Sequence, residues 1–215
     1  MNTLLLAAGL AASLVGTEPV GPPGVRVHYV DEHLYDTGST RPGPLRLTLT
    51  GSQTTSIAIV ELDPGRTTAE LTDLDSADRV GRVVAGATVR AGRTYRTTIV
   101  ARRDLIALAA NGAKTRLRLN GTRVTVPPPR AAARIVVSDD DLRVPGRLPT
   151  HGVIRVDNAG THPHRVVAVR LGTGAVTELV GPVSAGTTNR VHVRLRPGRY
   201  RVIADGSATA RTRVR

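Results

Sequence analysis

The stretch that decides the fold is Val156-Asp157-Asn158-Ala159-Gly160-Thr161-His162-Pro163-His164-Arg165-Val166-Val167-Ala168-Val169. Valine-rich segments lie on both sides of a polar turn, and this pattern is typical of a strand, a tight turn and a second strand. Apolar residues also alternate strictly in Leu45-Arg46-Leu47-Thr48-Leu49-Thr50. Because Phe and Trp are absent, any core must be aliphatic, and the many β-branched residues favour strands. We therefore expect an all-β protein.

The composition bounds the number of domains and the kinds of partner. With 215 residues, 40% of them hydrophobic, the chain is long enough for one large domain or two of about 100 residues each. It has no cysteine, which excludes disulfides and thiolate chemistry. The net charge of +13 comes almost entirely from arginine, so an anionic envelope polymer or a membrane surface is a candidate partner. A genome rich in G and C would also produce many arginines. Nucleic acid is a poor candidate, because the arginines are scattered along strands and almost no aromatic side chains are present for base stacking.

The N-terminus predicts export. Residues 3–15 form an apolar run that is too short to span a bilayer as an ordinary helix and has the length of a signal-peptide core. No Lys or Arg precedes it in Met1-Asn2-Thr3, so an uncleaved anchor is an alternative. We expect residues 1–17 to be a signal peptide or short N-terminal anchor, residues 18–24 to be a spacer, and the protein to be secreted or held in the cell envelope.

The chain contains an internal repeat. Residues 91–99 align with residues 185–193, and residues 45–65 align with residues 154–174. Three consecutive prolines, Pro127-Pro128-Pro129, interrupt the strand pattern between the two copies. We therefore expect a first β-sandwich domain at 25–126, a Pro/Ala-rich linker at 127–133 and a second β-sandwich domain at 134–215.

Three segments of the first copy need separate interpretation. Residues 67–80 have apolar residues at helical spacing, which predicts one short helix. Residues 105–110 have helical propensity, but their counterpart at 199–203 has a plain strand pattern, so the repeat predicts a strand. Asn120-Gly121 predicts a hairpin turn between alternating segments of 114–126. Seven or so short strands in each copy predict two tandem Greek-key β-sandwiches.

The second copy resembles a cupredoxin-like domain of the kind found in small secreted proteins of GC-rich bacteria. The resemblance extends to the first copy only through the repeat. It rests on the order of five features: an opening strand at 134–137, an acidic turn at 139–141, an Asn-x-Gly-x-x-Pro-His segment at 158–164, a Ser-Ala-Gly turn at 184–186 and a Leu-x-Pro-Gly-x-Tyr segment at 195–200. It implies a tandem pair of cupredoxin-like sandwiches.

The resemblance also implies that the copper site of such domains is lost. Copper-binding members use a His after the Pro, followed by Cys, His and usually Met on the final loop, and the sulfur ligands define the site. In this chain His164 falls at the first ligand position and Ala204 at the position of the Cys, and residues 205–215 contain no His or Met. Thr55 and Ala110 stand at the matching positions of the first copy. A blue-copper electron carrier is therefore not expected.

Other metal-ligating residue types gather at a few positions. His162 and His164 flank Pro163 and could bind copper or another metal ion given a third ligand, with His151 and His192 as candidates on nearby strands. Solvated or strand-facing imidazoles are the simpler interpretation. The same holds for two weaker candidates, the pair His28 and His33, and Asp139-Asp140-Asp141 as a calcium loop.

These observations favour a binding protein over an enzyme. The chain has no Gly-x-Ser-x-Gly and no His-Glu-x-x-His motif, and we expect no catalytic residues and no cofactor. The sequence predicts an exported, non-catalytic β-sandwich protein of the cell envelope that binds or scaffolds, with anionic polymers as partners. The alternative is a copper- or other metal-binding protein that uses a surface site at His162 and His164.

Overall fold

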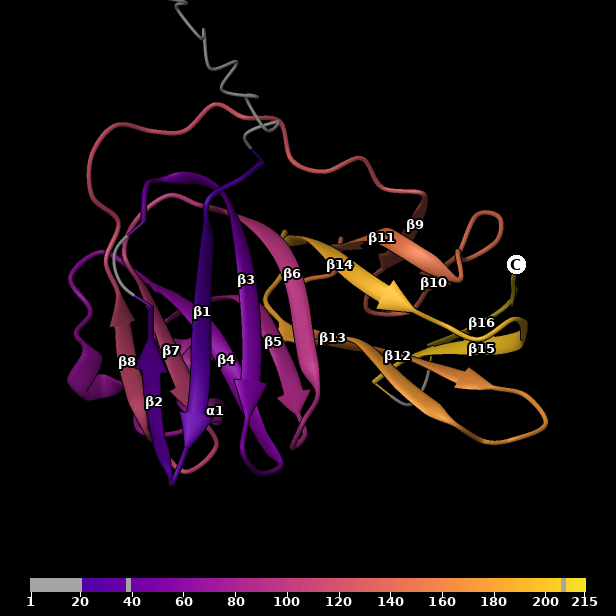
Figure 1. Cartoon of the computed structure of the whole chain (residues 1–215), viewed down its shortest axis with the longest axis horizontal. Helices are drawn as coiled ribbons and strands as arrows, with labels where there is room; N and C mark the ends of the chain where they lie inside the picture. Colours follow the sequence, from indigo (N-terminus) through magenta and orange to yellow (C-terminus); the bar gives the residue numbers. More distant parts are fainter. Residues whose placement is uncertain (1–20, 38–39, 206–207) are drawn as a thin grey trace, which may run out of the picture.

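A computed structural model of the chain describes residues 21–37, 40–205 and 208–215 (Figure 1). The first half holds the strands β1 (Gly24–Val30), β2 (His33–Asp36), β3 (Gly43–Gly51), β4 (Thr55–Leu62), β5 (Gly81–Val89), β6 (Thr94–Ala101), β7 (Leu105–Ala109) and β8 (Lys114–Leu117). Between β4 and β5 lie the 3-10 helix η1 (Thr68–Glu70) and the α-helix α1 (Leu74–Val80). The expected signal peptide or anchor at residues 1–17 lies outside the described residues.

The second half repeats the strands of the first. It holds β9 (Ala133–Val137), β10 (Leu142–Arg143), β11 (His151–Asn158), β12 (His164–Arg170), β13 (Val176–Val183), β14 (Thr188–Arg194), β15 (Gly198–Ala204) and β16 (Ala208–Val214). In the first half β2-β1-β3-β6 face β5-β4-β7-β8, and in the second half β10-β9-β11-β14 face β13-β12-β15-β16. In each half the first strand runs parallel to the third. The all-β class is thus confirmed, with two tandem Greek-key sandwiches and a short helix in the first.

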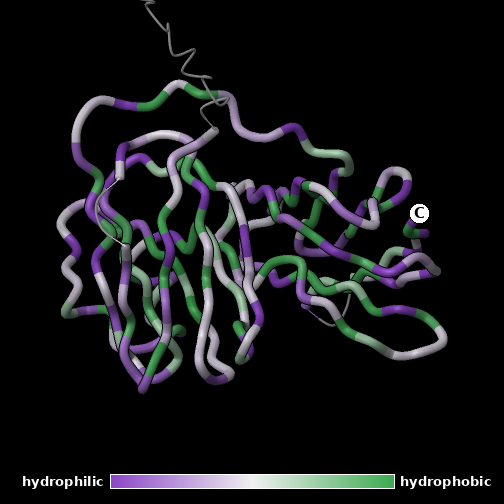
Figure 2. Tube along the Cα trace, in the orientation of Figure 1, coloured by the Kyte–Doolittle hydropathy of each residue, from purple (hydrophilic) through white to green (hydrophobic). Residues whose placement is uncertain are grey.

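The alternation of apolar and polar residues puts one face of each strand into an aliphatic core. In β3, for example, Leu45, Leu47 and Leu49 are fully buried. Each such side chain contributes about 1.5–3 kcal/mol by leaving water. Figure 2 shows hydrophobic and hydrophilic positions alternating along the strands. Each sandwich has its own core cluster, so the alternation accounts for both sandwiches.

A third cluster lies on the outer face of the first sandwich. There η1, α1 and the residues around them cover β4 and β7, with Leu71 and Ala77 packed in one cluster with Val60 and Ile106. The helical spacing predicted for 67–80 is therefore confirmed, but the segment is split into η1 and α1. The break falls at Asp73, whose carboxylate caps α1 by accepting from the backbone N–H of Ser76 at 2.7 Å.

The two sandwiches are joined through equivalent strands. β6 and β14 pair antiparallel through Thr97 with Val191 and Thr98 with Arg190, so one eight-stranded sheet runs through both halves. In the other layer β13 meets β5 (Figure 1). A Cβ added to Gly181 would lie 2.5 Å from the carbonyl carbon of Gly86, so the backbones approach as closely as two glycines allow. Antiparallel pairing of equivalent strands gives the halves a local twofold relation.

One local prediction is wrong and two are confirmed. Residues 156–169 do form a strand, a turn and a second strand, and β11 and β12 belong to different sheets. The prediction at Asn120-Gly121 is wrong, because this pair does not turn a hairpin. After β8 the chain runs beside residues 40–43, where the Val124 N–H donates to the Pro42 carbonyl at 2.8 Å, so it does not fold back on β8. The strand predicted at 105–110 is confirmed as β7.

Candidate functional site

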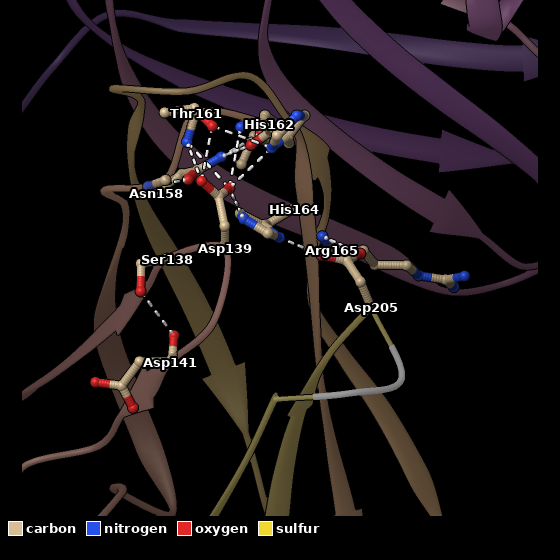
Figure 3. Close-up of polar contacts among 11 residues, drawn as sticks. Ser138, Asp139, Asp141, Asn158, Thr161, His162, His164, Arg165 and Asp205 are labelled. Atoms are coloured by element: carbon tan, nitrogen blue, oxygen red, sulfur yellow. Dashed lines mark hydrogen bonds and ion pairs between the residues drawn. The ribbon is translucent and has the colours of Figure 1, made fainter.

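The loop between β11 and β12 is built around a buried asparagine. Asn158 is 2% exposed, and its amide nitrogen donates to the carbonyls of His162 at 2.8 Å and Val183 at 2.9 Å. Its side-chain oxygen accepts from the Gly160 N–H at 2.9 Å. Asn158 thereby ties the loop to β13 and sets the direction in which His162 and His164 leave it (Figure 3).

Asp139, from the acidic turn after β9, reaches into this loop. Its carboxylate accepts from the Thr161 N–H at 3.0 Å and the Thr161 hydroxyl at 2.7 Å. A side chain at Gly160 would collide with it, since a Cβ there would lie 2.5 Å from Asp139 Oδ1. The hydrogen bonds from Thr161, with further ones from His162 and His164, hold the pKa of Asp139 well below its ordinary value. The carboxylate is therefore ionised under ordinary conditions.

His164 lies between two carboxylates. Its Nε2 is 3.1 Å from Asp139 Oδ1, and its Nδ1 makes a very short contact with Asp205 Oδ2, just after β15. Both ring nitrogens of His164 are therefore within hydrogen-bond distance of a carboxylate oxygen. Asp205 is fixed in turn by the backbone N–H of Arg165 at 3.0 Å. We call Asp139, His164 and Asp205 the His164 clamp; it joins the loops of three segments (Figure 3).

The copper ion that copper-binding cupredoxin-like domains hold does not fit the residues present. Ala204, at the expected Cys position, is a buried residue at the end of β15 and offers no ligand atom. Both nitrogens of His164 already face carboxylates. In the first sandwich Thr55 opens β4 as His164 opens β12, while strand pairing sets Ala109, not Ala110, opposite the counterpart of Val166. The expected Ala110 match is therefore displaced by one residue.

The predicted histidines are partly brought together. His162 Nδ1 lies 3.2 Å from the same Asp139 oxygen as His164, so these two imidazoles share a neighbour. His151 and His192 lie instead on β11 and β14, near a groove between the sandwiches. His28 and His33 belong to β1 and β2. Within residues 21–37, 40–205 and 208–215, no group of three or more His, Asp or Glu side chains is arranged to hold a metal ion.

The groove near His151 and His192 was not anticipated. It has a volume of about 830 Å³ and forms where β6 and β14 separate beyond their two paired residues. Residues 88–96 line one side of it, and the ends of β11 and β14 line the other. Its remaining lining comes from β12 and β13. Both sandwiches therefore contribute to one concave surface.

The groove is strongly basic. Arg90, Arg93, Arg96 and Arg194 line it, and all four are exposed. None of them forms an ion pair with an acidic side chain in the described part of the chain. Glu178 is the one acidic residue in the lining, and it is engaged by Arg165 at 2.9 Å and by the Thr88 N–H at 3.2 Å. The positive charge of the groove is therefore unneutralised.

The positive charge of the groove also affects the pKa of His192. Partial desolvation, together with Arg96 and Arg46, lowers the pKa of His192. Desolvation first, and then the surrounding positive charge, disfavour the protonated imidazole. Sequence reasoning missed the groove because its arginines come from segments about 100 residues apart in sequence. The one available signal was the turn 90–96, where three arginines surround Gly92.

The comparisons with known proteins give structural similarities alone. No protein-family model and no curated protein matches the sequence. Among solved structures, the chain is similar to a multicopper oxidase at 12% identity, covering 89% of this chain and 88% of that one with a TM-score of 0.29. It is similar to a Cu-containing nitrite reductase from Thermus scotoductus SA-01 at 10% identity, covering 89% of this chain and 60% of that one with a TM-score of 0.27. A third similarity, to Lac15 from a marine microbial metagenome, has 15% identity, covers 93% and 67% of the two chains, and has a TM-score of 0.29.

The multicopper oxidases and copper nitrite reductases are built from cupredoxin-like domains, the family that the second copy resembles in sequence. At these identities and TM-scores the similarities say nothing of activity or ligand.

Proposed function

We propose that this protein is a non-catalytic binding protein of the cell envelope that holds anionic polymers in the groove between its two sandwiches. One observation carries the proposal. Arg90, Arg93, Arg96 and Arg194 line a single groove without an acidic partner among the described residues. Such a cluster raises the energy of the free protein by mutual repulsion, and an anionic ligand relieves it.

The placement of the arginines favours a polymer over a small anion. Three of them come from the first sandwich and one from the second, so a ligand that neutralises all four must extend across the junction. Arginine suits this task because its planar guanidinium donates two parallel hydrogen bonds to phosphate or carboxylate groups. Concave walls also concentrate the field of the charges within the groove.

The envelope location rests on the N-terminal sequence. The apolar run at 3–15 has the length of a signal-peptide core, which supports export. None of the helices formed by the described residues is both long and apolar enough to cross a bilayer. The His164 clamp supports a non-catalytic role, because its polar groups contact one another across three loops.

Binding of polyphosphate at several salt concentrations tests the proposal. The variant Arg93→Gln/Arg96→Gln removes two groove charges, and Arg102→Gln/Arg118→Gln removes two exposed arginines of the same sandwich that make no side-chain hydrogen bond or ion pair in the described residues. We expect the groove variant to bind about tenfold more weakly, at roughly 0.5–1 kcal/mol for each exposed contact, and to have a smaller salt slope. Affinity that does not fall with ionic strength, or equal affinity in both variants, would refute the proposal.

The metal-binding alternative keeps one observation in its favour, since His162 and His164 both approach Asp139. Calorimetry with Cu(II) on the wild type and on His164→Ala decides it. Heat in the wild type that is lost in the variant would support a metal site. No heat in either protein removes this function and leaves the groove proposal intact.

A further inference from the structure

The outer face of the second sandwich is bare. The sheet β13-β12-β15-β16 packs its inner face on the core, and its other face forms three rows set by the strand register. One row runs Val176, Val169, Arg201, Arg211, and the next runs Leu171, Arg199, Arg213. The third, on the side of the groove, runs Glu178, Val167, Ile203, Thr209. We call this surface the outer face.

The first sandwich shows what such a face ordinarily needs. There the equivalent strands carry Ala58 opposite Leu108 and Val60 opposite Ile106, and all four side chains are buried under η1 and α1. The matching pairs of the second sandwich are Val167 with Ile203 and Val169 with Arg201. These have no helical segment over them, since β12 passes directly to β13. The outer face therefore keeps apolar side chains, but the helical segment that covers the equivalent face of the first sandwich is missing from the second.

On the basic side of the outer face, arginines of neighbouring strands repel one another. Arg199 stands directly opposite Arg213, and Arg201 directly opposite Arg211. Like charges at directly paired positions destabilise a sheet. All four arginines are exposed, and within the described residues none has an acidic partner. Arg147 joins three of them around a pocket of about 430 Å³ that also touches Leu171.

The apolar side of the outer face projects into solvent at the connection between β12 and β13. Leu171 is 39% exposed and Val176 is 56% exposed. Val167, Val169 and Ile203 are half-buried on the strands behind them. The surface thus offers hydrocarbon and unneutralised positive charge side by side.

We infer that the outer face docks the protein on an anionic lipid membrane. An anionic bilayer presents phosphates directly above hydrocarbon, so it can satisfy the arginines and accept Leu171 and Val176 at the same time. A soluble polyanion would leave the apolar half in water. A second copy of the chain, packed face to face by a twofold axis, would set arginine against arginine. The outer face adjoins the groove, because Val167 and Val176 also line it. Arg201 and Arg211 do not line the groove, so charge variants tell this docking apart from polymer binding there.

Vesicle co-sedimentation of the full chain tests the inference. The vesicles are phosphatidylcholine with or without phosphatidylglycerol, and Arg201→Gln/Arg211→Gln is compared with Arg102→Gln/Arg118→Gln. Residues 3–15 are present in every variant, so a difference between the variants reports on the outer face. We expect the outer-face variant to partition at least about tenfold less onto anionic vesicles, with no difference on neutral ones. Equal partitioning of the two variants overturns the inference.

A fluorescence measurement keeps the test independent of charge. Because the chain has no tryptophan, Val176→Trp supplies a single reporter, with Tyr35→Trp, 55% exposed in the wild type on β2, as its control. We expect anionic vesicles to shift the emission of the first to the blue and to leave the second unchanged. A shift in neither, or an equal shift in both, overturns membrane docking through this face. Arg93→Gln/Arg96→Gln should keep vesicle binding, so failure here and failure of the groove proposal are distinguishable.

Discussion

The close approach of Gly86 and Gly181 makes the junction of the sandwiches sensitive to one methyl group. Gly181→Ala adds a Cβ that would lie 2.5 Å from the carbonyl carbon of Gly86 and 2.7 Å from the Ala87 nitrogen. Ordinary van der Waals contact begins at 3.4 Å, and both obstacles are backbone atoms that cannot rotate away. β5 and β13 must therefore separate by about 0.9 Å.

Two hydrogen bonds across the junction limit that separation. The Tyr95 hydroxyl donates to the Leu179 carbonyl at 3.2 Å, and the Thr88 N–H donates to Glu178 at 3.2 Å. Both would exceed the range of a hydrogen bond, at about 1 kcal/mol each. Overpacking adds about 1–3 kcal/mol, part of which the separation relieves, so we expect Gly181→Ala to cost about 2–4 kcal/mol.

Urea unfolding followed by circular dichroism measures this cost. Gly24→Ala is the matched control, since the nearest atom to its Cβ, at 3.4 Å, belongs to the flexible side chain of Arg46, and the nearest backbone atom is 3.8 Å away. We expect the free energy of unfolding to fall in Gly181→Ala and to stay within about 0.5 kcal/mol of wild type in the control. The same variant should weaken polyphosphate binding, because the groove forms at this junction. Equal stability of the two variants would refute the reasoning that β5 and β13 touch.

Two further predictions concern titratable groups. Hydrogen bonds from Thr161 lower the pKa of Asp139 below its ordinary value of 3.8. The ionised Asp139 therefore stabilises the folded state fully above pH 3.8, and this stabilisation is lost as the pH falls through the folded-state pKa. The difference in urea midpoint between wild type and Asp139→Asn should close on acidification below about pH 4, and a difference that widens there would contradict the clamp. Burial, and then Glu178, raise the pKa of Tyr95 far above its ordinary value of 10. Tyr95→Phe should therefore leave the alkaline absorbance titration of the protein unchanged, while lowering the free energy of unfolding by about 1 kcal/mol. If the variant instead loses a titration step near the ordinary tyrosine pKa, Tyr95 is accessible to solvent and this prediction is wrong.

Local features of the fold were predictable where the signal lies within a few residues. The alternation in β3 and the helical spacing at 67–80 each record which face of one element is buried. At 105–109 the helical propensity of the residues predicted the wrong structure, and the strand pattern of the second copy predicted the right one. The hairpin turn predicted at Asn120-Gly121 was wrong because a local signal does not show which strand the next segment pairs with. A hairpin needs a partner strand on each side, and the chain after Leu119 takes its partners from residues 40–43.

The sites were less predictable because their members are distant in sequence. The Pro-His step drew attention to His164, but nothing near it indicated that Asp139 and Asp205 would close on its two nitrogens from 25 and 41 residues away. The absence of a Cys ligand could be predicted from Ala204 alone. The carboxylate contacts that His164 makes in place of a metal ion could not, because they depend on where the turn after β15 places Asp205.

The difference between the halves explains why the groove is open at one end of the β6–β14 pair. A twofold relation between β6 and β14 would create two equivalent openings, one at each end of the pair. At the second opening Ser184 exchanges hydrogen bonds with the backbone of Val83, accepting at 2.8 Å and donating at 2.9 Å, and its hydroxyl makes a very short contact with Asp78 of α1. The helical segment therefore does two things in the first sandwich: it covers the apolar outer face and it closes one opening. Its absence from the second sandwich leaves the equivalent face bare and the opposite opening free, so the groove and the outer face follow from a single asymmetry between the two copies.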